Sequence, residues 1–161
     1  MPTHALLDLD LPALTWLALL LNNTIIWYAV VFLFLLVVVW GARCRARCIL
    51  VSFAVLLVAI YAVKAYYHEA RDCDATRFGA ECPWDYGFPS GHAAISFFFV
   101  GASMGTPLFA FYFIVGALVS LTRLYLGVHT ITQVAGGIVI GMACYYFVDK
   151  VFYNRGWKKG I

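Results

Sequence analysis

Residues 88–96 read FPSGHAAIS, and the apolar run FFFVGASMG follows at 97–105. A turn, a serine and a titratable histidine therefore stand where an apolar helix begins. No charged side chain occurs between His92 and Arg123. This stretch is too long for one span, because about 20 apolar residues cross the hydrocarbon core. The turn-forming sequence Gly105-Thr106-Pro107 divides it, so we expect two helices there.

The composition predicts an integral membrane protein. Of the 161 residues, 64% are hydrophobic and 12% are charged, whereas about 25% of the residues in a soluble domain are charged. A soluble core of this length could not bury so much apolar surface. The net charge of +3 is small, and we expect no nucleic-acid partner.

We expect an all-α fold in one domain, residues 1–161, with a bundle of five transmembrane helices. The predicted spans are about 24–42, 47–70, 91–105, 107–127 and 130–150. Residues 3–21 are interpreted as an N-terminal interfacial helix, because Asp8 and Asp10 would be costly inside a span. A short sixth span is the alternative.

The distribution of basic residues predicts the orientation, since cytoplasmic loops are rich in Lys and Arg. Arg43, Arg45 and Arg47 lie between the first two spans, and Lys150, Arg155, Lys158 and Lys159 follow the last. The opposite side carries Lys64, Arg71, Arg77 and Arg123, mostly at the ends of spans. Cations at membrane depth indicate function. We therefore expect a cell-membrane protein with its active site on the non-cytoplasmic face.

Several polar residues are expected at this non-cytoplasmic end. Lys64 and Arg71 are seven residues apart, which predicts one helix face and a separation of about 10 Å along the axis. They would be joined there by Ser90, Gly91, His92, Arg123 and His129. Three cations and the amides at a helix N-terminus can neutralise a phosphate. Of two histidines, one can attack phosphorus and the other can protonate the leaving oxygen. Neither a metal nor another cofactor is indicated.

Three motifs in order resemble the membrane branch of the type 2 phosphatidic acid phosphatase superfamily. That family carries Lys-x6-Arg-Pro, then Pro-Ser-Gly-His, then Ser-Arg-x5-His-x3-Asp. This chain has KAYYHEARD at 64–72, PSGH at 89–92 and TRLYLGVHTITQ at 122–133. The internal spacings are kept, and the resemblance covers residues 64–133.

The resemblance implies a role for each motif residue. His129 would be the nucleophile that forms a phosphohistidine, and His92 would be the general acid. The phosphoryl oxygens would be held by Lys64, Arg71, Ser90, Gly91 and Arg123. Alternatives exist for single residues: His129 could be a histidine at the lipid headgroup level, and Ser90 a plain helix N-cap.

Gln133 and Asp72 depart from the family pattern. The usual aspartate at the position of Gln133 would orient His129 and stabilise its charged form, whereas glutamine supplies no charge. Glutamine there resembles the dolichyl diphosphatase and glucose-6-phosphatase branches, which are active. Thr130 and Gln133 also match a capping box for the last span, and both roles are compatible. Asp72 replaces a proline, which leaves the bend after Arg71 open.

The segment between the second and third spans has further features. Cys73 and Cys82 are nine residues apart, and a disulfide between them fits an oxidising compartment; two free thiols are the alternative. Trp84, Tyr86 and Phe88 could form the rim of a lipid entry groove or belong to an ordinary aromatic belt.

The sequence thus favours a lipid phosphatase whose partners are membrane lipids and a lipid phosphate substrate. A polyisoprenyl diphosphate is the preferred substrate, with phosphatidylglycerophosphate or phosphatidic acid next. A phosphotransferase with a lipid or alcohol acceptor, and a non-catalytic lipid-binding protein, are the alternatives. No oligomeric state is indicated.

Overall fold

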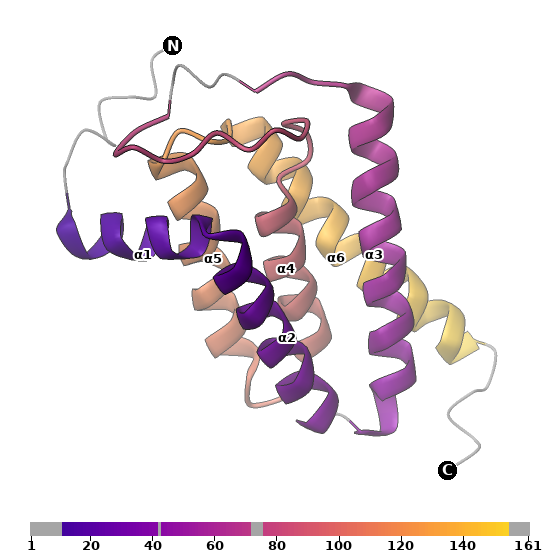
Figure 1. The fold of residues 1–161 in the computed structure, drawn as a ribbon. Helices are drawn as coiled ribbons and strands as arrows, with labels where there is room; N and C mark the ends of the chain where they lie inside the picture. The colour runs from indigo at the N-terminus through magenta and orange to yellow at the C-terminus, as the bar shows by residue number, and fades with distance from the viewer. Residues whose placement is uncertain (1–10, 42, 72–75, 155–161) are drawn as a thin grey trace.

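The computed structural model describes residues 11–41, 43–71 and 76–154, and in these ranges the chain is helical, without strands. The helices are α1 (Pro12–Asn22), α2 (Thr24–Gly41), α3 (Ala46–Tyr67), α4 (Gly91–Ser103), α5 (Phe109–Tyr125) and α6 (Ile131–Asn154), with a 3₁₀ turn, η2 (Arg43–Arg45), between α2 and α3. Helices α2 to α6 form the bundle, and α1 runs across their direction near the end that carries residues 76–90 (Figure 1). The expected all-helical bundle is confirmed for the described residues. Of the expected interfacial helix at 3–21, the structure shows the helix from Pro12 onward, and residues 3–10 lie outside the described residues.

Among the described residues, three helices satisfy the requirements for a membrane span by length and composition alone: α2, α3 and the part of α6 up to Val151. Helices α1, α4 and α5 are apolar but shorter. The 13 residues of α4 rise only about 20 Å. A short helix is tolerated at this position because it is enclosed by protein, where backbone beyond its ends is shielded from lipid.

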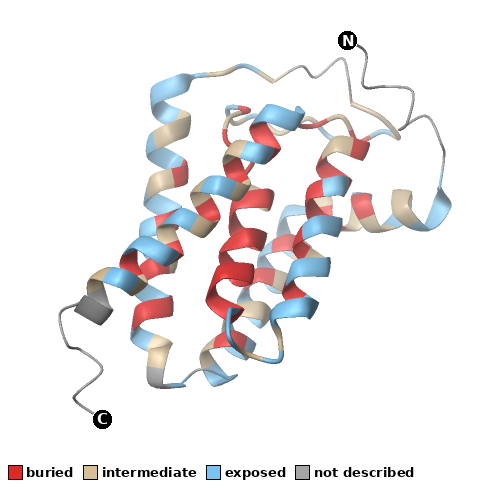
Figure 2. Ribbon diagram, turned by 180° about the vertical axis from the view of Figure 1, so that it is seen from behind, coloured by how far each residue is buried: buried red, intermediate tan, exposed pale blue. Residues whose placement is uncertain are grey.

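Helix α4 is the centre of the bundle. Every residue from Ala93 to Ser103 is buried, and Figure 2 shows this helix as a nearly continuous buried column. Helix α6 approaches α4 closely through two glycines. A Cβ on Gly141 would overlap the carbonyl oxygen of Ala94, and one on Gly137 would lie 2.5 Å from that of Ser90. Small residues allow such backbone contact between membrane helices, and here they bring the start of α6 against the PSGH turn.

Glycines with positive φ lie in the turns on both sides of α5. Gly105 (φ 77°) lies in the turn between α4 and α5, as expected for Gly-Thr-Pro. Gly127 (φ 70°) follows the end of α5, and its N–H donates to the carbonyl of Leu124 at 3.0 Å. Because α6 begins only at Ile131, His129 lies in the short connection between two helices.

The end of α3 differs from the prediction. The helix was expected to continue to residue 70, but it ends at Tyr67, where His68 adopts a left-handed conformation with φ 46°. Arg71 therefore lies beyond the helix, and the prediction that it shares a helix face with Lys64 is wrong. The reason is that contacts to loop residues turn this stretch toward α6, since Arg71 Nη1 donates to the carbonyl of Val128 at 2.9 Å.

Candidate active site

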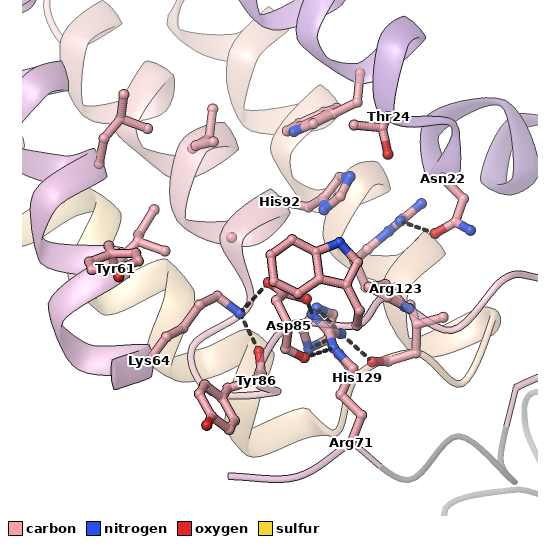
Figure 3. A pocket seen from close by; sticks show the side chains of 18 of the residues that line it. Asn22, Thr24, Tyr61, Lys64, Arg71, Asp85, Tyr86, His92, Arg123 and His129 are labelled. Atoms are coloured by element: carbon pink, nitrogen blue, oxygen red, sulfur yellow. Dashed lines mark hydrogen bonds and ion pairs between the residues drawn. The ribbon is translucent and has the colours of Figure 1, made fainter. Parts of the chain in front are cut away.

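A cavity of about 820 Å³ opens at the end of the bundle that carries the PSGH turn. Its polar lining includes Lys64, Arg71, Gly91, His92, Arg123 and His129. The structure thus brings together six of the eight residues expected at the site from the sequence, as Figure 3 shows for most of them. The other two, Ser90 and Gln133, are buried behind the lining at 0% and 3% exposure.

His129 is held by the start of α6. Its Nδ1 lies 2.8 Å from Gln133 Oε1. The N–H of Thr130 donates to the same oxygen at 3.2 Å, and the N–H of Gln133 donates to Thr130 Oγ1 at 3.4 Å. These two reciprocal bonds form the capping box expected from the sequence. Gln133 therefore caps α6 and contacts His129 at the same time.

The hydrogen bonds around Gln133 fix the tautomer of His129. The backbone N–H of Thr130 can only donate, so the Gln133 atom facing it is the amide oxygen. Because this oxygen accepts, His129 Nδ1 carries the proton and donates to it. The lone pair is then on Nε2, which lies 3.0 Å from Arg71 Nη1. A guanidinium N–H only donates, so this Nε2 lone pair accepts from Arg71 Nη1 in the wall of the cation-lined cavity.

The surroundings of His129 favour its neutral form. Burial, followed by the positive charge of Arg71, lowers the pKa of His129 from 6.5 to about 3. A neutral imidazole is the form that can act as a nucleophile.

Asp85 joins two of the expected phosphate-binding cations, and the sequence analysis missed it. Its carboxylate forms ion pairs with Lys64 Nζ at 2.9 Å and with Arg71 Nη2 at 2.6 Å (Figure 3). Although burial acts to raise the pKa of Asp85, the Lys64 hydrogen bond and the charge of Arg71 lower it overall. Asp85 is therefore a carboxylate anion at neutral pH, positioned where Lys64 and Arg71 meet.

Arg123 is almost completely buried, with 1% exposure. Its Nη1 donates to Asn22 Oδ1 and its Nη2 to the carbonyl of Ala18, each at 3.1 Å. Both acceptors belong to α1, so the crosswise helix holds a cation of the cavity. No motif in the sequence indicates this contribution from the N-terminal region.

The PSGH turn places three residues in different environments. His92 Nε2 lies 3.2 Å from the carbonyl of Leu21, and its ring packs on Trp27 with the ring centroids 4.3 Å apart. Gly91 faces open space, since an added Cβ would meet no atom within 4 Å. Ser90 occupies the N-cap position of α4, but its side chain makes no capping hydrogen bond. The plain N-cap interpretation of the Ser90 side chain is therefore wrong.

The remaining cavity lining is largely apolar and lies between α2, α3 and α4. It includes Trp27, Tyr28, Leu57, Ile60, Tyr61 and Ile95. Trp84 and Tyr86 also line the cavity, and Trp84 is 99% exposed. Phe88 instead packs against Tyr67, with the ring centroids 5.2 Å apart. Of the three aromatic residues considered for the rim, Trp84 and Tyr86 border the cavity.

Two further expectations concern cysteines and metals. Cys82 is disulfide-bonded; Cys73, its expected partner, lies outside the described residues, so this pairing stays a prediction. In the ranges that the structure describes, no group of three or more His, Cys, Asp or Glu side chains is arranged to hold a metal ion.

Comparison with known proteins places this geometry in a family. No curated protein sequence matches the chain significantly. A crystal structure described as the first transmembrane PAP2-type phosphatidylglycerolphosphate phosphatase from Bacillus subtilis has a similar fold, with a TM-score of 0.69 over 91% of this chain and 80% of that chain. The two sequences are 16% identical, so this likeness concerns the fold. The family model of the PAP2 superfamily matches residues 45–157, which include all three motifs. This match confirms the recognition made from the sequence and supports the expected class of enzyme, a membrane phosphatase: the chain belongs to the PAP2 superfamily.

Proposed function

We propose that the protein is a metal-independent lipid phosphatase that acts through a phosphohistidine at His129. The observation that carries this proposal is that one cavity has both a charged and an apolar part to its lining. Its polar part combines three cations with two histidines, and its apolar part lies between α2, α3 and α4. Such a cavity fits a phosphate joined to a hydrocarbon tail. A polyisoprenyl diphosphate is the favoured substrate, followed by phosphatidylglycerophosphate and phosphatidic acid.

The geometry supports a two-step mechanism. The Nε2 lone pair of His129 attacks phosphorus, the bond from phosphorus to the leaving oxygen breaks, and His92 protonates that oxygen. A water molecule, deprotonated by His92, then attacks the phosphohistidine; the P–N bond breaks and phosphate leaves. Lys64, Arg71 and Arg123 offset the negative charge of the phosphoryl oxygens in both steps.

The Leu21 carbonyl supports this assignment of His92. A carbonyl only accepts hydrogen bonds, so Nε2 of His92 donates to it. The other nitrogen, Nδ1, is then left to exchange a proton with the leaving oxygen and with water. The negative charge of a bound substrate favours the protonated ring that the first step needs.

We further propose that the active site faces away from the cytoplasm. The 3₁₀ turn η2, which contains Arg43 and Arg45, lies at the opposite end of the bundle from residues 76–90 (Figure 1), and residues 83–86 of that segment line the cavity. Ala80, in the loop before the PSGH turn, is buried at 8% exposure and is therefore a poor position for cysteine labelling. Tyr66 is 81% exposed near the cavity end of α3, so Tyr66→Cys is the better probe. A membrane-impermeant maleimide should label it in intact cells, with the wild-type chain as the control; labelling only after the cells are opened would reverse the orientation.

The test of the activity is phosphate release by purified protein in detergent containing EDTA. The panel contains a polyisoprenyl diphosphate, phosphatidylglycerophosphate and phosphatidic acid, and His129→Ala is the inactive control. Rapid acid-free quenching should trap a phosphoenzyme in wild type and none in His129→Ala. We expect the highest kcat/KM with the diphosphate.

Other outcomes identify the alternatives. Activity lost in EDTA and restored by magnesium would contradict the mechanism. Transfer of phosphate to an added alcohol in preference to water would identify a phosphotransferase. A folded protein that releases no phosphate from any member of the panel would be a lipid-binding relative.

A further inference from the structure

Glu69 lies behind Gln133, on the side away from His129. The amide Nε2 of Gln133 donates to Glu69 Oε1 at 2.6 Å, while Oε1 of the same amide accepts from His129 Nδ1 at 2.8 Å. His129, Gln133 and Glu69 thus form a continuous chain of hydrogen bonds that ends in a carboxylate. Glu69 lies within KAYYHEARD, at one of the variable positions between Lys64 and Arg71.

We propose that Glu69 is a positioning residue for the hydrolysis, supplying through Gln133 the negative charge that stabilises His129 as it becomes phosphorylated. The proposal rests on the phosphohistidine function proposed above. When Nε2 bonds to phosphorus and Nδ1 keeps its proton, the imidazole ring gains positive charge. Gln133 alone offers the ring an amide dipole. The Glu69 carboxylate, hydrogen-bonded to the other end of that amide, polarises it and adds a full negative charge. This charge is separated from the imidazole by the Gln133 amide, whereas the usual aspartate would contact the imidazole directly.

The orientation of the Gln133 amide makes the chain unambiguous. Thr130 donates its N–H to Oε1, so Nε2 is the atom that faces Glu69, and a carboxylate is an acceptor for it. Each hydrogen bond in the chain therefore has a matched donor and acceptor. If the Gln133 amide were flipped, its NH₂ would face the Thr130 N–H and its oxygen would face the Glu69 carboxylate. Neither pair could form a hydrogen bond.

The backbone around Glu69 is built to hold this contact. The N–H of Gly87 donates to the Glu69 carbonyl at 2.8 Å. A Cβ on Gly87 would lie 2.6 Å from Gln133 Nε2, a distance that real Cβ atoms essentially never show. A glycine at position 87 therefore leaves room for the amide between His129 and Glu69. The hydrogen bond between Glu69 and Gly87 thus joins the parts of the loop before and after Cys82, at the residue where the chain of hydrogen bonds ends.

The test uses the full-length protein and four variants. Glu69→Gln preserves shape and hydrogen bonding but removes the charge, so kcat should fall about 10- to 100-fold with KM nearly unchanged. Gln133→Asp should also lose activity, because its carboxylate would face that of Glu69. The double variant Glu69→Gln/Gln133→Asp should be faster than either single variant, since the new amide can donate to the new carboxylate. Glu81→Gln, an exposed glutamate in the same loop, is the matched control and should keep wild-type kinetics.

A residue with only a structural role would give a different pattern. In that case Glu69→Gln would retain kcat, or the double variant would show the product of the two single losses. Either result, with all variants folded by their thermal unfolding, would overturn the proposal. Recovery of kcat in the double variant supports the proposal. Each single change lowers kcat, so the two together can raise it only if a negative charge at position 133 replaces the charge lost at position 69.

A measurement without substrate separates this proposal from the proposed function. In ¹⁵N-histidine-labelled protein, His129 should be the Nδ1–H tautomer, and Glu69→Ala should weaken that preference by releasing Gln133. If the tautomer responds but wild type hydrolyses no lipid phosphate, the proposed function fails and the coupling stands. If wild type hydrolyses substrate but neither kcat nor the tautomer responds to Glu69, the present proposal fails alone.

Discussion

Asp85 forms a 2.6 Å ion pair with the same Arg71 guanidinium that lies 3.0 Å from Nε2 of His129, the nitrogen proposed as the nucleophile. Its other carboxylate oxygen pairs with Lys64 at 2.9 Å. This carboxylate therefore pairs with two of the cations expected to hold the substrate phosphate. An incoming phosphate has to compete with Asp85 for both of them.

This competition predicts that Asp85→Asn binds phosphate more tightly. The variant keeps the shape of the side chain but removes the competing charge. The inhibition constant of inorganic phosphate should fall about tenfold, which corresponds to ~1.4 kcal/mol. The measurement is inhibition of hydrolysis at several phosphate concentrations. Asp149→Asn, which breaks the 3.0 Å pair with Arg45, is the control and should leave the constant unchanged. An unchanged or higher constant in Asp85→Asn would show that Asp85 instead assists phosphate binding.

Two adjacent asparagines offer a second prediction. Asn22 accepts from Arg123, whereas Asn23 Oδ1 accepts from the N–H groups of Ile25 and Ile26 and caps α2. Asn22→Ala should lower kcat/KM about tenfold, because Arg123 loses an acceptor that fixes its guanidinium. Asn23→Ala should instead cost about 1 kcal/mol of stability with little loss of activity. Initial rates and thermal unfolding of both variants make the comparison. Equal effects of the two changes on activity would indicate that α1 acts only as a structural support.

The sequence predicted which residues line the cavity better than it predicted the contacts between them. The motif spacings identified Lys64, Arg71, His92 and Arg123 because each family motif is a short, contiguous stretch of sequence. They did not identify Asp85, because an acidic residue in a loop has no fixed spacing to the cations it contacts.

The bounds of the helices also depend partly on contacts that the local sequence does not reveal. Apolar runs and the glycine turns predicted the bundle, since they depend on local composition. The end of α3 at Tyr67 was not predicted, because His68 adopts its left-handed conformation with no glycine to signal it. The contribution of α1 to Arg123 depends on a tertiary contact between residues 101 apart in sequence, which neither periodicity nor composition encodes.

The lowered pKa of His129 predicts how stability depends on pH. The unfolded chain binds a proton at this residue near pH 6.5, but the folded protein binds it only near pH 3. Between these values the unfolded state holds more protons, so His129 makes stability fall as the pH falls. From pH 7 to pH 5, wild type should lose about 2 kcal/mol relative to His129→Gln. Denaturant titrations of both proteins in detergent at the two pH values give the difference. A difference that does not change with pH would mean that His129 titrates alike in both states.

Gly91 and Gly137 separate a role in substrate binding from a role in packing. A Cβ at Gly91 would enter open space in the cavity lining, whereas one at Gly137 would lie 2.5 Å from the Ser90 carbonyl and 3.2 Å from Ala93 Cβ. Gly91→Ala should therefore fold with nearly unchanged thermal stability, since alanine is also favoured over glycine in a helix. Its KM should rise several-fold, because the methyl group stands where phosphoryl oxygens approach the helix N-terminus.

Gly137→Ala should show the reverse pattern. Overpacking against rigid backbone typically costs about 1–3 kcal/mol, so its unfolding temperature should drop. Helix α6 would move away from α4, and with it Gln133, whose carbonyl accepts the Ser90 N–H at 2.9 Å. The two variants are compared by thermal unfolding and by kcat and KM at a temperature where both are folded. A Gly91→Ala protein that is unstable but has a normal KM would place this glycine in the packing of the turn and remove it from the phosphate site.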